Sequence, residues 1–169
     1  MKKMFLTAGL LASVAAAQTT PAPAPAPIQL APTTTVQHAT LSLAAANRIA
    51  MLAVGNCAAQ GYNVTATVVD RMGVTLSVAR AENAGPHTVD ASLRKAYTSA
   101  SARNLTSAMA AGLAANPTLA DIPGFLILAG GVPVRVNNAV VGAVGVGGAP
   151  SGLVDEKCAT DAIRTVLGQ

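Results

Sequence analysis

Apolar residues recur with the period of an α-helix in three long segments of the chain. We expect helices from about Ser42 to Gly61, from Gly85-Pro86 onward and from about Leu153 to Leu167. A shorter helix is expected from Asn104 or Thr106 to Ala114. The Asn116-Pro117 pair that follows cannot continue it. The second long helix is expected to bury one apolar face, which consists of Val89, Leu93, Ala96, Tyr97 and Ala100.

Short apolar and β-branched runs predict five strands, over residues 64–69, 74–78, 125–128, 132–136 and 139–146. Arg71-Met72-Gly73 should form a tight turn between the first two. Asn137-Asn138 should form a hairpin turn between the last two, because Asn tolerates positive φ. The order of elements predicts an α+β domain with a five-stranded, mainly antiparallel sheet. The first and last helices should pack together on one face of that sheet.

The first 36 residues are expected to lie outside the fold. Lys2 and Lys3 precede an apolar run over residues 4–14, and three alanines end it at residue 17. This pattern is typical of a secretory signal peptide cleaved after residue 17, and no cysteine follows that would carry a lipid. Residues 18–36 alternate Pro with Ala and end in a Thr-rich stretch, which favours an extended, disordered linker. We therefore expect a secreted protein, with the periplasm as its compartment.

Removal of the signal peptide would leave nine basic and seven acidic residues, a formal charge of +2 instead of +4. These charges are scattered and aromatic residues make up 2% of the chain, so nucleic acid is not an expected partner. No later apolar run reaches the roughly 18 residues that a membrane-spanning helix needs. Residues 37–169 fit one soluble domain, since about 130 residues is a common domain size.

Two cysteines remain, and each lies on an apolar stripe with helical spacing. Cys57 belongs to the first expected helix and Cys158 to the last. In an oxidising compartment a disulfide between them would close a loop of about 100 residues, which is worth roughly 4–5 kcal/mol in the chain-entropy model. Two buried free thiols are the alternative.

Histidine is the first candidate for ligand contact, because the chain has only two. His87 follows Gly85-Pro86 at a helix start, beside backbone amides that lack helical partners. Its imidazole could bind iron or another ligand, with Asp90 orienting the second ring nitrogen. Arg80 or Arg94 could then hold an anionic group. The alternative is a histidine that bonds only its own loop.

Glycines interrupt the last expected strand at residues 142, 145, 147 and 148. Their spacing matches neither dinucleotide-binding nor phosphate-loop motifs. It indicates close packing against a helix or a neighbouring subunit. Gly130-Gly131-Val132-Pro133 predicts a bulge or a sharp turn between strands.

Zinc-ligand spacing and Gly-x-Ser-x-Gly are both absent, and Ser151 is a helix-start residue, so no complete catalytic constellation is visible.

Several of these segments together resemble the GlcG/HbpS family of haem-binding proteins. They are residues 84–88 (AGPHT), 94–98 (RKAYT), 130–133 (GGVP), 140–150 (VVGAVGVGGAP) and 155–159 (DEKCA). The resemblance extends from about residue 41 to the C-terminus. It implies a profilin-like sheet flanked by helices, a homo-oligomer, and a role in haem capture, storage or sensing, with an unidentified sensor or transport partner.

The resemblance also adds candidate haem contacts to His87 and Arg94. They are His38, which taken alone is a solvated linker residue, Thr106 and Lys95. Both histidines are candidate iron ligands. Without the family, Thr106 is a helix N-cap and Lys95 a solvated or ion-paired residue. Two other functions stay open: an enzyme or accessory subunit acting on a small organic acid, with His87 as base, and an oligomeric interaction module without a ligand.

Overall fold

The computed structural model describes residues 26–168. The predicted signal peptide and the first part of the predicted linker, up to residue 25, lie outside the described residues. The chain divides into a unit that ends at Val36 and a unit that begins at Gln37. Residues 26–36 are exposed and form no helix or strand. Within residues 26–168, no helix combines the length and the apolar character needed to cross a membrane.

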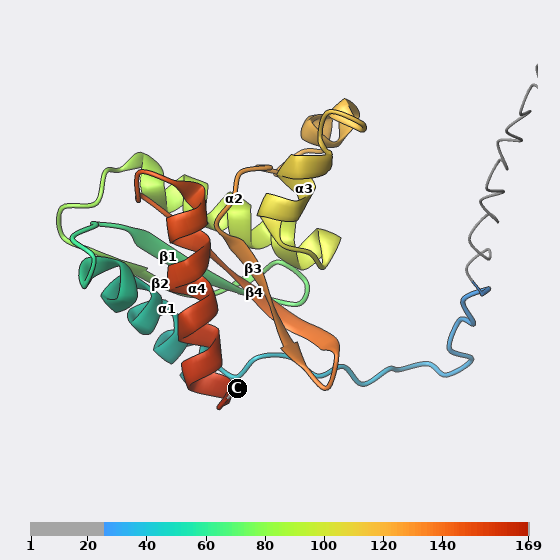
Figure 1. The fold of residues 1–169 in the computed structure, drawn as a ribbon. Helices are drawn as coiled ribbons and strands as arrows, with labels where there is room; N and C mark the ends of the chain where they lie inside the picture. The colour runs from blue at the N-terminus through green and yellow to red at the C-terminus, as the bar shows by residue number, and fades with distance from the viewer. Residues whose placement is uncertain (1–25, 169) are drawn as a thin grey trace, which may run out of the picture. The chain divides into compact units, whose positions relative to one another are not determined.

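Residues 37–168 of the second unit contain four strands, four α-helices and one short 3₁₀ helix. They are α1 (Leu43–Ala58), β1 (Thr65–Asp70), β2 (Thr75–Arg80), α2 (His87–Ala102), α3 (Thr106–Gly112), η1 (Pro117–Asp121), β3 (Gly131–Val136), β4 (Ala139–Gly147) and α4 (Gly152–Leu167). Figure 1 shows how the labelled helices and strands are arranged. The strands form one sheet in the order β2-β1-β4-β3, and every neighbouring pair is antiparallel. The predicted α+β class and antiparallel sheet are confirmed.

The prediction of a fifth strand at residues 125–128 is wrong. This segment has no regular structure. The Leu126 N–H donates to the Thr98 hydroxyl of α2 at 2.8 Å. A side chain therefore satisfies a backbone donor that a strand would use in its ladder. Ile127 is buried, so the apolar character of the run reflects packing of an irregular segment, which the sequence pattern alone cannot distinguish from a short strand.

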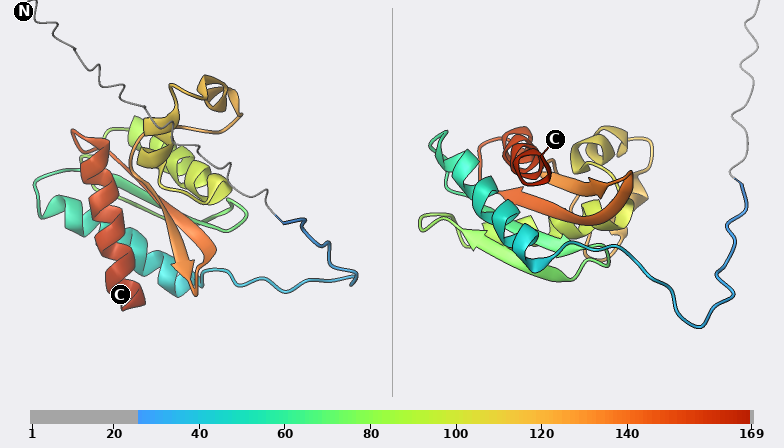
Figure 2. Two further views of the ribbon diagram at one scale, coloured as in Figure 1. Left: turned by 45° about the vertical axis from the view of Figure 1, so that its right-hand side comes forward. Right: turned by 90° about the horizontal axis from the view of Figure 1, so that it is seen from below.

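Helices α1 and α4 pack together on one face of the sheet, as predicted (Figure 2). Their core contains alternate residues of the two central strands, Ala66 and Val68 of β1 with Val144 and Val146 of β4. A disulfide joins Cys57 of α1 to Cys158 of α4. Of the two alternatives for the cysteines, the bridge is confirmed.

Helix α2 covers the other face of the sheet, and its contacts are made by small and polar groups. Thr65 and Thr67 of β1 share hydrogen bonds of 2.7 Å with Thr88 and Ser92 of α2. A Cβ added to Gly145 of β4 would lie 2.5 Å from the backbone nitrogen of Ala96 and against the carbonyl oxygen of Ser92. Gly145 thus permits the backbones of helix and strand to meet directly, which confirms the predicted close packing against a helix.

The predicted apolar face of α2 is wrong in part. Ala96 and Ala100 are buried, but Val89 is 41% exposed and Leu93 and Tyr97 are each 36% exposed. The close approach at Gly145 leaves space only for small side chains between helix and sheet. The large apolar residues therefore lie outside that contact.

Several expected boundaries shift by a few residues. Helix α1 ends three residues before Gly61, although Gly61 does adopt a positive φ of 84°. Asn137 and Asn138 have φ values of 47° and 66°, which confirms the hairpin turn.

The N-cap prediction for Thr106 is wrong, because Leu105 holds that position without a side-chain bond. Buried Thr106 instead accepts a hydrogen bond from the Gly131 N–H at 2.8 Å.

Candidate functional site

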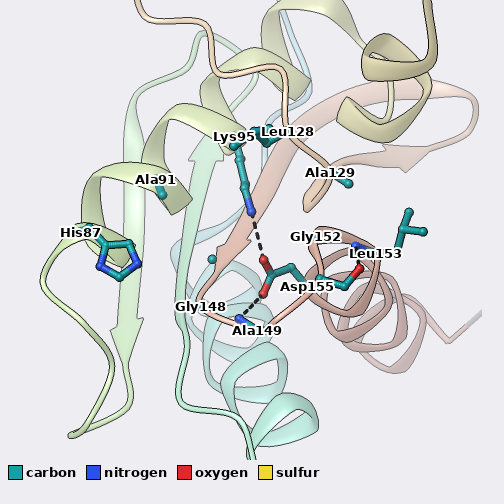
Figure 3. Close-up of a pocket in the computed structure, with 12 residues that line it drawn as sticks. His87, Ala91, Lys95, Leu128, Ala129, Gly148, Ala149, Gly152, Leu153 and Asp155 are labelled. Atoms are coloured by element: carbon teal, nitrogen blue, oxygen red, sulfur yellow. Dashed lines mark hydrogen bonds and ion pairs between the residues drawn. The ribbon is translucent and has the colours of Figure 1, made fainter.

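A cavity of about 470 Å³ lies between the start of α2, the start of α4 and the chain that leaves β4 (Figure 3). Its lining comes from four segments: His87, Ala91 and Lys95 of α2, Leu128 and Ala129, Gly147 to Ala149, and Ser151 to Leu153 with Asp155. A cavity of this size, formed where elements from distant parts of the chain meet, is typical of small-molecule sites.

A buried ion pair lies on one side of this cavity. Lys95 Nζ is 3.0 Å from Asp155 Oδ2, and the two side chains are 7% and 2% exposed. Lys95 Nζ also donates to the Val146 carbonyl oxygen at 2.9 Å, and Asp155 Oδ1 accepts from the Ala149 N–H at 3.0 Å. Each charge therefore has a second hydrogen bond, which a buried pair needs to offset its desolvation. An ammonium group carries three hydrogens, so Lys95 keeps one donor for a ligand.

Glycine makes space for this ion pair. Gly130 has a φ of 124°, directly before β3. A Cβ at this position would lie 2.9 Å from Lys95 Nζ and 3.0 Å from Asp155 Cβ. A side chain there would displace the pair, so the Gly130-Gly131 motif is part of the site even though its residues carry no functional groups.

Apolar side chains lie at two sides of the cavity. Leu128 is 56% exposed and Leu153 is 64% exposed, and Ala91 lies between His87 and Lys95 on α2 (Figure 3). Exposed large apolar residues that flank one cavity differ from singly scattered ones, because together they offer a surface for an apolar ligand. The site thus combines apolar walls with a buried charge.

His87 is the first residue of α2, and its exposed side chain lies at the edge of the cavity (Figure 3). Asp90 does not orient it. The Asp90 carboxylate instead pairs with Arg94, four residues on, at 2.9 Å. Arg80 donates to the carbonyl oxygen of Ala84 in the loop before α2. The arrangement of base and orienting carboxylate on which the enzyme hypothesis depended is therefore not formed.

The structure does not bring His38 and His87 together. His38 Nδ1 lies 3.0 Å from Arg71 Nη1, immediately after the last residue of β1. His87 neighbours Thr88, which bonds the first residue of β1. A six-residue strand spans about 17–20 Å. The two imidazoles of one chain therefore cannot bind the same iron atom.

Lys95 is the one predicted contact besides His87 that lines the cavity, while Thr106 and Arg94 do not. The sequence alone does not identify Asp155 as a site residue, because an acidic side chain in the first turn of a helix is common and needs no ligand to explain it. One signal was present: Asp155 precedes Cys158 by three residues and Ala159 by four, on the buried stripe of the helix.

Among residues 26–168, no three His, Cys, Asp or Glu side chains gather as a metal site.

Comparisons with known proteins agree with this fold. A family model described as "Haem degrading protein HbpS-like" matches residues 41–164. The crystal structure of a double mutant of HbpS from Streptomyces reticuli is 45% identical, with a TM-score of 0.77 over 87% of this chain and 100% of the other. An uncharacterised 15.0 kDa protein from the dhaT-dhaS intergenic region of Citrobacter freundii is 36% identical over 117 residues, which are 66% of this chain and 82% of that protein.

A more distant structure is that of PduOC in complex with heme. It is 19% identical, with a TM-score of 0.67, and the match covers 73% of this chain and 93% of the other. At this identity the likeness concerns the fold alone.

Proposed function

The chain belongs to the HbpS-like family of haem degrading proteins, and we propose that it binds haem in the cavity between α2 and α4. The description of the family concerns haem, which supports a haem-related role, and the PduOC structure is a heme complex of a protein with a similar fold. The main support for placing haem in this cavity is that a buried ammonium group, two exposed leucines and an imidazole all line it.

The lining fits the chemistry of a porphyrin. A porphyrin has flat apolar faces and two carboxylates. Leu128 and Leu153 would contact the faces, and Gly147 and Gly148 have no side chains that would block their approach. When bound, haem supplies an iron atom that accepts an axial nitrogen ligand. His87 is the imidazole that lines this cavity.

Lys95 would hold a haem carboxylate. Its ammonium group is fixed between the Val146 carbonyl and the Asp155 carboxylate, so its remaining N–H has a defined position. Asp155 pairs with the lysine in a buried setting, and the ligand carboxylate would gain a charge-assisted hydrogen bond from the ammonium group. The pair would therefore orient haem as well as join α2 to α4.

We place this activity outside the cytoplasm, in haem capture, storage or sensing. The Cys57–Cys158 disulfide supports an oxidising compartment, where such bonds persist. Cell fractionation with N-terminal sequencing tests the export proposal, and the expected mature chain begins at Gln18. The homo-oligomer implied by the resemblance stays a prediction, which sedimentation velocity tests.

Haemin titration of the mature protein tests the binding proposal. We expect a saturable shift of the Soret band, with affinity reduced about tenfold or more in His87→Ala. His38→Ala is the matched control, because it removes the other exposed imidazole at the far end of β1. A loss in His38→Ala with none in His87→Ala would place the haem elsewhere, and no saturable shift in the folded wild type would end the proposal.

A second pair of variants tests the apolar wall. Leu153→Asp places a carboxylate beside the cavity, and Leu43→Asp makes the same change at a comparably exposed leucine of α1, 59% against 64% exposed. We expect Leu153→Asp alone to weaken haemin binding, because it adds a charge at an apolar ligand surface. Equal effects of the two variants would contradict the assignment of this wall.

A further inference from the structure

A second, smaller cavity is surrounded by arginines. It has a volume of about 200 Å³ and is lined by Arg71, Arg103 and Arg135 together with Asn138, Ala139 and Val140. The three arginines come from the turn after β1, the C-cap of α2 and strand β3. This cavity shares no lining residue with the cavity between α2 and α4.

No carboxylate neutralises these arginines in the part of the chain that the structure describes. The ion pairs among those residues join Arg94 to Asp90, Lys95 to Asp155 and Lys157 to Asp161. Asp70 precedes Arg71, but its Oδ1 accepts the backbone N–H groups of Met72 and Val74 at 2.8 and 2.9 Å. Three guanidinium groups thus surround one small cavity without a counter-charge, although like charges repel one another.

Two of the three guanidinium groups have hydrogen-bond partners other than a carboxylate. Arg135 Nη2 donates to the Arg103 carbonyl oxygen at 2.6 Å, and its Nη1 donates to the Asn138 carbonyl oxygen at 3.3 Å. Arg71 Nη1 lies 3.0 Å from His38 Nδ1. Arg103 adopts a left-handed φ of 54°, which is unfavourable for a residue with a Cβ. The fold therefore positions the guanidinium groups of Arg71 and Arg135 through side-chain contacts, and Arg103 joins them at the same cavity through its place at the end of α2.

We propose that this cavity binds a small phosphate dianion, either inorganic phosphate or the phosphate group of a monoester. The planar guanidinium group suits phosphate oxygens, and arginines from three segments line one small cavity. The cavity has less than half the volume of the one between α2 and α4, about 200 against about 470 Å³, which suits a compact ion. This site is separate from the haem proposal and does not depend on it.

Isothermal titration calorimetry of the mature protein tests this site. Sodium phosphate is titrated at constant ionic strength set with sodium chloride, so that general screening stays unchanged. We expect saturable binding of one phosphate per chain. Glycerol 3-phosphate is titrated in parallel: tighter binding than that of inorganic phosphate identifies a monoester as the ligand, and equal or weaker binding identifies the free ion.

Two variants from different segments test the assignment. Arg71→Gln and Arg103→Gln should each weaken phosphate binding about tenfold or more, because each removes one charged fork. Arg48→Gln, at an exposed position of α1, removes the same charge elsewhere and should leave the affinity unchanged. Unfolding midpoints confirm that each variant is folded.

Three results would overturn the proposal. They are the absence of saturable heat with the folded wild type, equal losses in Arg48→Gln and Arg71→Gln, and binding to phosphatidylglycerol vesicles without binding to soluble phosphate. The second result would mean a general charge effect and the third a membrane surface.

Discussion

Lys95 and Asp155 lie 60 residues apart in the sequence and form a buried ion pair of 3.0 Å. The two helices that carry them cover opposite faces of the sheet, and the pair joins them beside the last residues of β4 (Figure 3). This contact places a charged group in the cavity. It also connects α2 on one face of the sheet to α4 on the other face, at the end of the sheet.

Removing one partner of this pair should strongly destabilise the domain. Asp155→Asn leaves the Lys95 ammonium buried without a counter-charge, which costs about 3–5 kcal/mol. Urea unfolding followed by circular dichroism measures this loss. The double variant Lys95→Met with Asp155→Leu should recover much of it, since neither charge is then left unpaired. If the double variant loses as much unfolding free energy as the sum of the losses in Lys95→Met alone and Asp155→Leu alone, the pairing is contradicted.

Gly145 and Gly147 offer a matched test of the contact between α2 and the sheet. In Gly145→Ala the new methyl group would overlap the backbone of α2 at Ser92 and Ala96. In Gly147→Ala the nearest atom, Ala91 Cβ, lies at an ordinary contact distance of 3.4 Å. We expect Gly145→Ala to lose at least about 2 kcal/mol of unfolding free energy, as overpacked cores do, and Gly147→Ala to stay close to wild type. Equal stability of the two variants in urea unfolding would refute the close approach.

The sequence predicts most of the elements because local signals mark their limits. Ser42 and Ser151 cap helices, and Asn137-Asn138 forms a turn that positive φ permits. The prediction of a fifth strand is wrong because an apolar run indicates that a segment is buried but does not indicate which groups its backbone bonds. For Leu126 that partner is a hydroxyl of α2.

The site was harder to predict, since its main contact joins distant residues. Helical periodicity favours burial of large apolar side chains, so the pattern of α2 predicts that Val89, Leu93 and Tyr97 are buried and that Lys95 is not. The structure reverses this choice because glycines of β4 admit α2 too closely for large side chains. The resemblance to the family, and not the spacing of residues, pointed to Lys95. No pattern in one sequence indicated that Asp155 is its partner.

The disulfide should contribute much of the stability of the domain. Cys57 and Cys158 enclose a separation of 101 residues, and the chain-entropy model gives about 4–5 kcal/mol for such a loop. We expect the Cys57→Ala/Cys158→Ala double variant to unfold at a lower urea concentration than the wild type. A reducing agent should bring the wild type close to the double variant and leave the double variant itself unchanged. Coincident unfolding curves for oxidised wild type and double variant would contradict this role.

Two glycines near the C-terminal end of α1 separate the effect of backbone conformation from that of space. A Cβ added to Gly55 or to Gly61 would meet nothing within 4 Å, but Gly61 has a φ of 84° whereas Gly55 lies inside α1. Gly55→Ala should stabilise the domain by about 0.5–1 kcal/mol, because alanine favours the helix and restricts the unfolded chain. Gly61→Ala should destabilise it by about 1–2 kcal/mol, because the left-handed conformation is unfavourable for a residue with a Cβ. Thermal and urea unfolding measure the change in unfolding free energy for each variant. If both variants are stabilised or both are destabilised, α1 does not end as described.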